Sequence, residues 1–308
     1  MITILGAGGS IGNELAPLLA AAGRRFRLVG RQPREIFGGE CYAADLTDLG
    51  QTVRAVEGSE IAVLAAGLKY DVRVWAELWP RIMQNSVEAC KRAGARLVFV
   101  DNVYMYGRVE GAMTEETPLA PCSKKGEIRA RIAAGLMEQV KGGGLTAMIA
   151  RSADFYGPGK VRGVPNLLVM EAMAKRSTPA WLMNARVPHS LTYTPDAARG
   201  VAMLMERESA WNQVWHLPTA APAPTGEEFV EMAARVMGRP AKFRVYGKAM
   251  LRMVGWFNSE IRESMEMLYQ NEAGYVFDSG KFAREFGFAG TPYAEGVRRS
   301  CEWLQTGK

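Results

Sequence analysis

Glycines are the residues near the start of the chain whose spacing suggests chemistry. They lie within residues 6–12 (GAGGSIG), directly after an apolar run at residues 2–5. Glycine permits a sharp turn off a strand, and it lets backbone N–H groups approach a phosphate with no Cβ between them. The N-terminus of a following helix adds partial positive charge. The pattern predicts a turn that binds the pyrophosphate of a dinucleotide through Gly6, Gly8, Gly9, Ser10, Ile11 and Gly12.

Arg31 follows the second apolar run, residues 26–29, where a dinucleotide-binding sheet meets the adenosine ribose. A carboxylate there would bind the ribose hydroxyls, whereas a guanidinium can form paired, charge-assisted hydrogen bonds with a 2′-phosphate. Arg31 therefore favours NADP as the cofactor. NAD stays open, because Arg31 could instead be a surface loop residue that leaves either cofactor acceptable.

Short apolar runs alternate with segments of helical spacing through the first half of the chain. The helical segments carry apolar residues about one turn apart, as at Ile128, Ile132 and Leu136. Such alternation indicates βαβ units and a parallel sheet covered by helices on both faces. The runs expected to form strands are residues 2–5, 26–29, 61–65, 96–100 and 146–150.

The second half of the chain is organised differently. Clusters of helix-breaking residues occur at residues 157–159 (GPG) and 218–224 (PTAAPAP), with helical segments between and after them. We therefore predict an α/β fold, in which a Rossmann-type, doubly wound parallel sheet carries a smaller C-terminal substrate-binding lobe. The NAD(P)-binding Rossmann domain is expected at residues 1–155 and 189–217, and the substrate-binding lobe at residues 156–188 and 218–308.

Composition disfavours several other classes of protein. Of the 308 residues, 48% are hydrophobic, yet no apolar run reaches the ~20 residues that cross a bilayer. The net charge of +6 comes from dispersed Lys and Arg, so we expect neither a nucleic-acid nor a membrane partner. Four scattered cysteines without a CxxC pair predict no disulfide framework and no metal site. Because the N-terminus also lacks a secretory layout, a cytoplasmic protein with a small-molecule substrate is expected.

The order of motifs along nearly the whole chain resembles the extended short-chain dehydrogenase/reductase superfamily, which includes nucleotide-sugar epimerases and dehydratases. Its GxxGxxG turn is matched within residues 6–12. The resemblance also covers Asn85 and residues 103–107 (VYMYG), 151–159 (RSADFYGPG) and 196–198 (DAA). The contacts it implies are Asp45 and Leu46 at the adenine, and Ala65, Ala66 and Gly67 along the cofactor at the end of the fourth strand.

The resemblance ends at the catalytic helix, so the chain looks like an atypical member. Family members that move hydride use a Tyr-x-x-x-Lys motif, in which the lysine lowers the pKa of a phenol that exchanges a proton with the substrate. The corresponding segment, residues 118–126 (PLAPCSKKG), contains no tyrosine. Dehydratases of the family carry an Asp-Glu pair where this chain has Val103-Tyr104. Sugar dehydration is therefore disfavoured.

Asn102, Tyr104 and Asp154 are the candidate catalytic residues that remain. Asn102 stands at the family's serine or threonine position, and strand alternation would point Tyr104 to the same face. Tyr104 could alternatively pack beneath the lobe. Asp154 stands at the family's asparagine position beside the nicotinamide, where a carboxylate could act as acid or base, or could cap a loop.

Lys69, Tyr70 and His189 are the residues expected to contact the substrate. Lys69 and Tyr70 follow the fourth strand at its carboxyl end, where ligands of open α/β sheets bind. Lys69 could equally face solvent, and His189 could be an ordinary hydrogen-bonded histidine. Trp75, Trp79 and the methionines of residues 250–267 could line an apolar pocket or belong to the core.

Three functions are compatible with this pattern, of which the third is isomerisation or cyclisation that the cofactor assists or that needs no cofactor. The first is an NADP-binding epimerase or reductase that acts on a small carbonyl or hydroxyl substrate with a non-standard proton donor. The second is a catalytically silent NADP(H)-binding sensor or scaffold, since the motif for turnover is absent. A homodimer is compatible with the superfamily, whose members often pair through the helices after the fourth and fifth strands.

Overall fold

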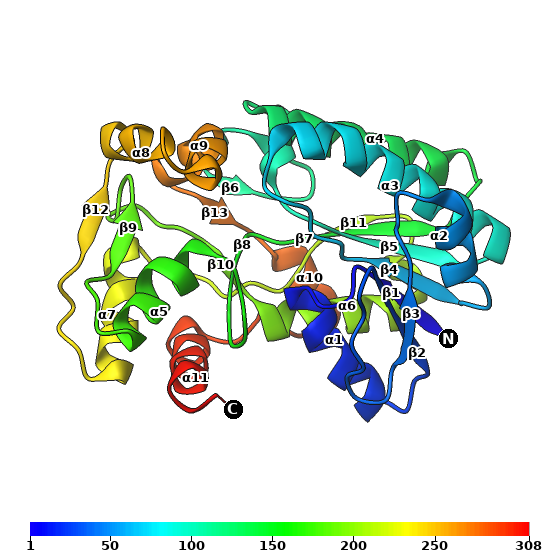
Figure 1. The fold of residues 1–308 in the computed structure, drawn as a ribbon, viewed down its shortest axis with the longest axis horizontal. Helices are drawn as coiled ribbons and strands as arrows, with labels where there is room; N and C mark the ends of the chain where they lie inside the picture. The colour runs from blue at the N-terminus through cyan, green and yellow to red at the C-terminus, as the bar shows by residue number, and fades with distance from the viewer. Residues whose placement is uncertain (308) are drawn as a thin grey trace.

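The computed structural model describes residues 1–307, and its centre is a seven-stranded sheet (Figure 1). The strand order is β11-β7-β5-β4-β1-β2-β3, and every neighbouring pair is parallel. This is the doubly wound order of a Rossmann fold, so the predicted fold class is confirmed. The strands are β1 (Ile2–Leu5), β2 (Phe26–Gly30), β3 (Glu40–Ala43), β4 (Ile61–Leu64), β5 (Arg96–Asp101), β7 (Ala147–Arg151) and β11 (Val214–His216).

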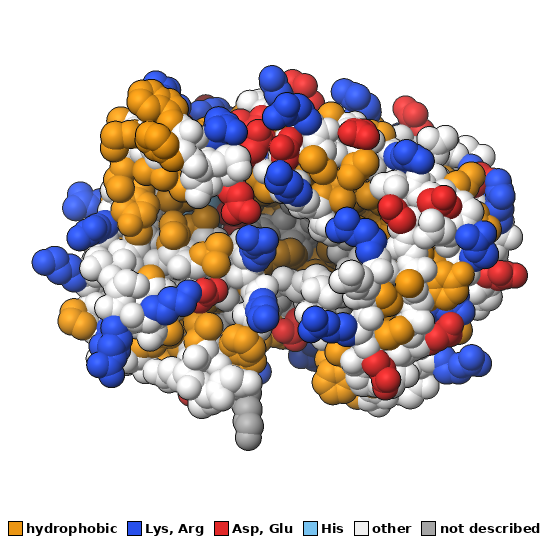
Figure 2. Space-filling model, in the orientation of Figure 1, with side chains coloured by type: hydrophobic (Ala, Val, Ile, Leu, Met, Phe, Trp, Pro, Cys, Tyr) orange, Lys and Arg blue, Asp and Glu red, His pale blue; other side chains and the backbone are white. Residues whose placement is uncertain are grey.

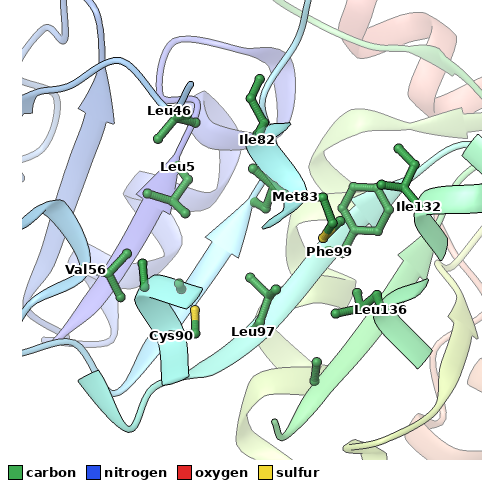
Figure 3. Packing of buried hydrophobic residues seen from close by; sticks show 14 of the residues in the cluster. Leu5, Leu46, Val56, Ile82, Met83, Cys90, Leu97, Phe99, Ile132 and Leu136 are labelled. Carbon is green, nitrogen blue, oxygen red and sulfur yellow. The ribbon is translucent and has the colours of Figure 1, made fainter. Parts of the chain in front are cut away.

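Helices cover both faces of the sheet because its strands are apolar on both sides. Within β1, Ile4 packs with the helices of one face and Leu5 with those of the other. Figure 3 shows the cluster of buried side chains that contains Leu5, in which Leu97 and Phe99 of the sheet pack against the overlying helices. One face carries α1 (Ser10–Ala21), α6 (Thr194–Glu206) and α10 (Gly280–Phe286); the other carries α2 (Leu49–Val56), α3 (Val72–Ala93) and α4 (Lys124–Lys141).

A second lobe lies beside the sheet, at the left of Figure 1. Its own core includes Trp181, Phe229 and Val297. It comprises η2 (Pro165–Met170), α5 (Glu171–Ala174), β9 (Ala180–Leu182), α7 (Gly226–Met237), β12 (Arg244–Tyr246), α8 (Lys248–Gly255), α9 (Ser259–Ser264), η4 (Met265–Asn271) and α11 (Tyr293–Thr306).

Short elements connect the sheet to this lobe. The strand pairs β8–β10 and β6–β13 are parallel, as is β9–β12 within the lobe. Their bounds, with those of the remaining turns, are β6 (Ala112–Met113), β8 (Asp154–Tyr156), β10 (Leu191–Tyr193), β13 (Val276–Phe277), η1 (Tyr104–Tyr106) and η3 (Glu208–Ala210). The predicted domain boundaries remain a prediction.

All five predicted strands are present, while β3 and β11 were not predicted. The edge strand β3 is largely exposed, and β11 has three residues, so neither leaves a strong apolar run. Pro17 lies inside α1, which continues past it to Ala21. Within residues 1–307, no helix is long and apolar enough to span a membrane.

A buried chain of hydrogen bonds links the sheet to the segment after β13. Arg151 Nη1 donates to the Tyr106 hydroxyl at 2.7 Å, and that hydroxyl lies 2.8 Å from His216 Nε2. His216 Nδ1 lies 2.7 Å from the Asp278 carbonyl oxygen. Because a carbonyl only accepts, Nδ1 carries the ring proton and Nε2 accepts from Tyr106. Burial lowers the pKa of His216 to about 3.

We expect the free energy of unfolding to fall as the pH drops from 6.5, the ordinary His pKa, towards 3. In this window the unfolded chain binds a proton at His216 that the folded chain does not bind. The contribution lost between pH 6.5 and pH 5 is about 2 kcal/mol. Urea unfolding at both pH values measures it. His216→Gln keeps a neutral side chain and should reduce the loss, whereas an equal loss in both proteins would assign it to other groups.

Candidate active site and dinucleotide cradle

The turn after β1 leaves no room for a side chain at residue 6. Gly6 has φ +96°, and a Cβ built there would lie 2.3 Å from the Cα of Ala66, which follows β4. The strand order reverses between β1 and β4, which is where ligands of such sheets bind. Gly8, at φ +93°, has open space where its Cβ would stand. Glycine is required at residue 6 because the backbone of Ala66 approaches closely, and at residue 8 it leaves the backbone open to a ligand.

Helix α1 begins directly after these glycines, at Ser10. Gly9 is its N-cap residue, and no side chain caps the helix. The first N–H groups of a helix have no partner within it, and they attract anions. Ile11 is buried, and the Cβ position of Gly12 lies 3.5 Å from the Ile4 side chain, so the helix packs closely on β1. The turn fits a dinucleotide pyrophosphate.

The predicted adenosine end brings Arg31 and Asp45 together. Hydrogen bonds from the backbone N–H and hydroxyl of Thr47, at 2.9 and 2.8 Å, lower the pKa of Asp45. The charges of Arg31 and Arg81 lower it further. Arg31 is exposed at the end of β2, and Arg81 on α3 is a second cation near this carboxylate that the sequence analysis did not identify.

The other predicted cofactor contacts, Leu46 and the three small residues after β4, border this end of the sheet. The Leu46 carbonyl oxygen accepts a 2.9 Å hydrogen bond from Asn85 Nδ2, which joins the segment after β3 to α3. Ala65 and Ala66 follow β4 half-buried, and Gly67 is exposed with open space at its Cβ position. These small residues keep the backbone at the carboxyl end of β4 accessible to a ligand.

Tyr70 and Tyr104 meet at the carboxyl end of the sheet. Their hydroxyl oxygens are 3.5 Å apart, and the Tyr104 ring stacks on Trp75 with centroids 6.2 Å apart. Lys69 is exposed, and its carbonyl oxygen accepts from Trp75 Nε1 at 3.0 Å. The polar groups of this corner therefore come from the loop after β4 and from η1.

The expectation that strand alternation orients Tyr104 is wrong. Strand β5 ends at Asp101, and Tyr104 begins the 3-10 turn η1. The Asn102 Oδ1 atom accepts the Tyr104 N–H at 3.1 Å, so the side chain of Asn102 caps this turn. An Asx cap competes with the extended strand conformation, which explains why the strand stops here.

Asp154 and His189 form the most polar pair of the site. His189 Nε2 lies 3.0 Å from Asp154 Oδ2, and the side-chain exposures are 3% and 29%. The pair arises because β8 and β10 run side by side, with Asp154 opening β8 and His189 preceding β10. An ionised carboxylate only accepts, so Nε2 carries the proton that it donates. His189 Nδ1 is buried and has no hydrogen-bond partner among residues 1–307.

Four tyrosines lie close enough to Asp154 for its charge to act on them. Burial raises the pKa of each phenol, and the negative charge of Asp154 raises it further. For Tyr104 the resulting pKa is about 12. A phenol in this state keeps its proton at neutral pH and acts as a hydrogen-bond donor, not as a base. The four are Tyr70, Tyr104, Tyr269 and Tyr275.

Lys125 lies close to these tyrosines, but two carboxylates balance its positive charge. Its Nζ lies 4.7 Å from the centre of the Tyr70 ring. The same Nζ donates to Glu263 Oε2 at 2.9 Å and to Glu266 Oε1 at 2.8 Å, and the lysine side chain is fully buried. Two carboxylates outweigh one ammonium, so the lysine does not lower the pKa of Tyr70.

The sequence analysis found Tyr70, Tyr104, Asp154 and His189, and the structure brings these four together. The sequence analysis missed Tyr269 and Tyr275 of the C-terminal segment and the buried Lys125 on α4. Tyr269 and Tyr275 are more than a hundred residues from Asp154, and no local spacing marks them. Figure 2 shows the molecule hollowed between the sheet and the second lobe, with Lys and Arg around the hollow.

These features define a Rossmann-type dinucleotide-binding protein with a polar site at the carboxyl end of its sheet. The chain belongs to the NAD dependent epimerase/dehydratase family, whose model matches residues 2–216. This confirms the resemblance inferred from the motifs. A comparison with curated protein sequences gives no match.

Solved structures of similar fold cover essentially the whole chain. UDP-glucose 4-epimerase from Thermus thermophilus, in complex with NAD, is 17% identical over 100% of this chain and 99% of its own, with a TM-score of 0.81. A double mutant of DesIV, a dTDP-glucose 4,6-dehydratase from Streptomyces venezuelae with NAD bound, is 19% identical over 99% of this chain and 97% of its own, with a TM-score of 0.80. UDP-glucose 4-epimerase from Thermotoga maritima is 18% identical over 99% of both chains, with a TM-score of 0.82.

Proposed function

We propose that this protein is an NADP-dependent oxidoreductase or epimerase that acts on a small carbonyl or hydroxyl substrate, with Asp154 as its proton donor and acceptor. The Asp154–His189 pair is the observation that carries this proposal. The Asp154 carboxylate is partly exposed, and no hydrogen bond occupies its Oδ1 within residues 1–307. His189, buried behind it, holds Oδ2 in a fixed position.

The surrounding phenols complete the proposed site. Tyr70 and Tyr104 keep their protons, so they can donate hydrogen bonds to a substrate oxygen and polarise its C–O bond. Asp154 then removes the hydroxyl proton of a carbinol, or returns it in the reverse direction. The bound dinucleotide supplies the hydride acceptor or donor.

NADP is the cofactor we propose, because Arg31 stands where the ribose is predicted and the charges of Arg31 and Arg81 both act on Asp45 at the predicted adenine end. The experiment is a thermal-shift titration with NADPH and NADH, followed by absorbance assays with aldehydes, ketones and sugar nucleotides. A ligand at ~100 times its Kd should raise the free energy of unfolding by about 2.7 kcal/mol. A flat curve with both cofactors would contradict every dinucleotide function.

Replacing Arg31 by alanine should weaken NADPH binding about tenfold or more and leave NADH binding nearly unchanged, because a hydrogen bond to a charged group contributes about 1.5–3 kcal/mol. Fluorescence titration of both cofactors measures the ratio. Arg25→Ala is the matched control, because it removes the same charge just before β2, at the opposite end of that strand. If Arg31→Ala lowers the affinity for NADPH and for NADH equally, Arg31 does not bind a 2′-phosphate.

The second candidate is a cofactor-binding sensor or scaffold without turnover. The observation that favours it is the state of the phenols: burial and carboxylates raise their pKa, and Lys125 is already paired with Glu263 and Glu266. Tight NADPH binding without any absorbance change across the substrate panel would support this candidate over the enzyme.

A further inference from the structure

Helix α8 presents an apolar surface that no other part of residues 1–307 covers. Its inner side buries only Leu251 and Gly255. On its outer side Met253 is 56% exposed, and the residues that follow the helix, Trp256 and Phe257, are 72% and 89% exposed. Figure 2 shows apolar side chains gathered at the end of the second lobe, where Figure 1 places α8 and α9. We call Met250, Met253, Trp256 and Phe257 the α8 surface.

The segment that carries the α8 surface is strongly basic. Residues 232–259 contain six Lys or Arg residues and no Asp or Glu. Among residues 1–307, Lys242, Arg244 and Arg252 form no ion pair, and all three are exposed. The six cations are Arg235, Arg239, Lys242, Arg244, Lys248 and Arg252.

Carboxylates next to this segment do not cancel the charge. Glu260 lies 3.7 Å from Arg162, which is itself a cation of a neighbouring loop. Glu272 pairs with Arg108 and, at 3.3 Å, with Lys248. Glu263 and Glu266 share the buried Lys125, so this cluster keeps one negative charge, fewer than the three positive charges of Lys242, Arg244 and Arg252. The free charge around the α8 surface is therefore positive.

Exposed Trp, Phe and Met flanked by unpaired Lys and Arg form the pattern of a helix that lies in a lipid–water interface. The apolar side chains enter the acyl boundary, and the cations remain at the anionic headgroups. An acidic protein partner would match the charge, but it would not require indole and phenyl rings at the outermost point of the surface. We propose that the α8 surface docks this protein onto an anionic lipid membrane.

This interaction differs from a membrane span. The expectation of no membrane partner rested on the length of apolar runs and on the dispersed charge of the whole chain, and neither describes one face of a short helix. The basic residues alternate with apolar ones along residues 242–257, so no long run forms. The segment continues into α9 and η4, whose Glu263 and Tyr269 belong to the candidate site.

The experiment is vesicle flotation of the full chain with phosphatidylcholine alone and with phosphatidylcholine containing phosphatidylglycerol. The chain should float with the anionic vesicles, stay behind with the neutral ones, and be released by high salt. The double substitution W256S/F257S should lower binding about tenfold or more. Because both side chains are exposed, folding is expected to be unaffected, and circular dichroism checks this. F37S, which removes another exposed aromatic residue, is the control.

The charge requirement is tested with matched double substitutions. R244Q/R252Q should reduce binding to anionic vesicles about tenfold, whereas R25Q/R131Q, which removes two exposed cations elsewhere, should not. The proposal is overturned if the chain does not float, or if W256S/F257S floats like the unaltered protein. It is also overturned if W256S/F257S abolishes self-association in sedimentation while vesicles are not bound, because the α8 surface would then be a contact between copies.

Discussion

Replacing Asp154 by asparagine should lower turnover by about 10²–10⁴-fold, which is the usual contribution of a positioned general acid or base. The amide keeps the shape of the side chain and an oxygen that can accept from His189 Nε2, now 3.0 Å from Oδ2. It cannot take a proton from a substrate hydroxyl at neutral pH. NADPH binding should be unchanged, because the glycine turn and Arg31 lie on other loops. Steady-state kinetics and NADPH titration of the same preparation separate the two effects.

His189→Gln is the companion substitution for Asp154. Glutamine can still donate one hydrogen bond but cannot hold the carboxylate in the fixed orientation of the ring, which is stacked on Tyr275 at 4.5 Å. We expect a smaller loss in kcat than for Asp154→Asn, because the carboxylate itself is kept. If Asp154→Asn keeps full kcat while Tyr104→Phe loses it, the phenol rather than the carboxylate moves the proton.

The glycine turn after β1 could be predicted because its determinants are local. Gly6 needs a positive φ and a backbone free of Cβ, and both needs are visible as glycine spacing next to an apolar strand. The position of Arg31 could be predicted for the same reason, since Arg31 directly follows β2. The fold class followed from the same short-range alternation of strands and helices.

The substrate side could be predicted only in part because it is assembled by long-range contacts. Asp154 and His189 were separate candidates until the β8–β10 pairing placed them together. Tyr104 was expected on a strand, but Asn102 caps a turn there and ends β5. Lys125 lies in residues 118–126, of which the sequence showed only that they contain no tyrosine. Its burial beside Tyr70 depends on Glu263 and Glu266, which no spacing rule connects to α4.

Asp101→Asn should lower the free energy of unfolding by about 3–5 kcal/mol, because within residues 1–307 it removes the one carboxylate that pairs with two buried guanidiniums. Asp101 is fully buried, and Arg129 and Arg151 are each 4% exposed. Arg129 Nε donates to Asp101 Oδ1 at 2.7 Å, and Arg151 Nε lies 3.8 Å from Oδ2. The Trp79 ring, 4.4 Å from the Arg129 guanidinium, offsets only part of the lost charge.

Urea unfolding at neutral pH measures this loss, and Glu295→Gln on α11 is the matched control. Glu295 also pairs with two arginines, but all of them are on the surface, so its replacement should change stability far less. A similar small change for Asp101→Asn would mean that water reaches the buried guanidiniums.

A double-mutant cycle separates the lost charge from the lost hydrogen bonds. Arg129→Gln removes one of the two cations, so the double variant Asp101→Asn/Arg129→Gln should lose less stability than the sum of the single variants. The same variants also test a link to the candidate site. The Asn102 N–H donates to Asp101 Oδ1 at 2.9 Å, and the Asn102 side chain accepts the N–H of Tyr104 at the start of its turn. Asparagine at position 101 keeps an accepting oxygen for that N–H. We therefore expect Asp101→Asn to lower the free energy of unfolding while the turn at Tyr104 persists. If the turn is lost as well, the buried charge of Asp101 itself holds the turn.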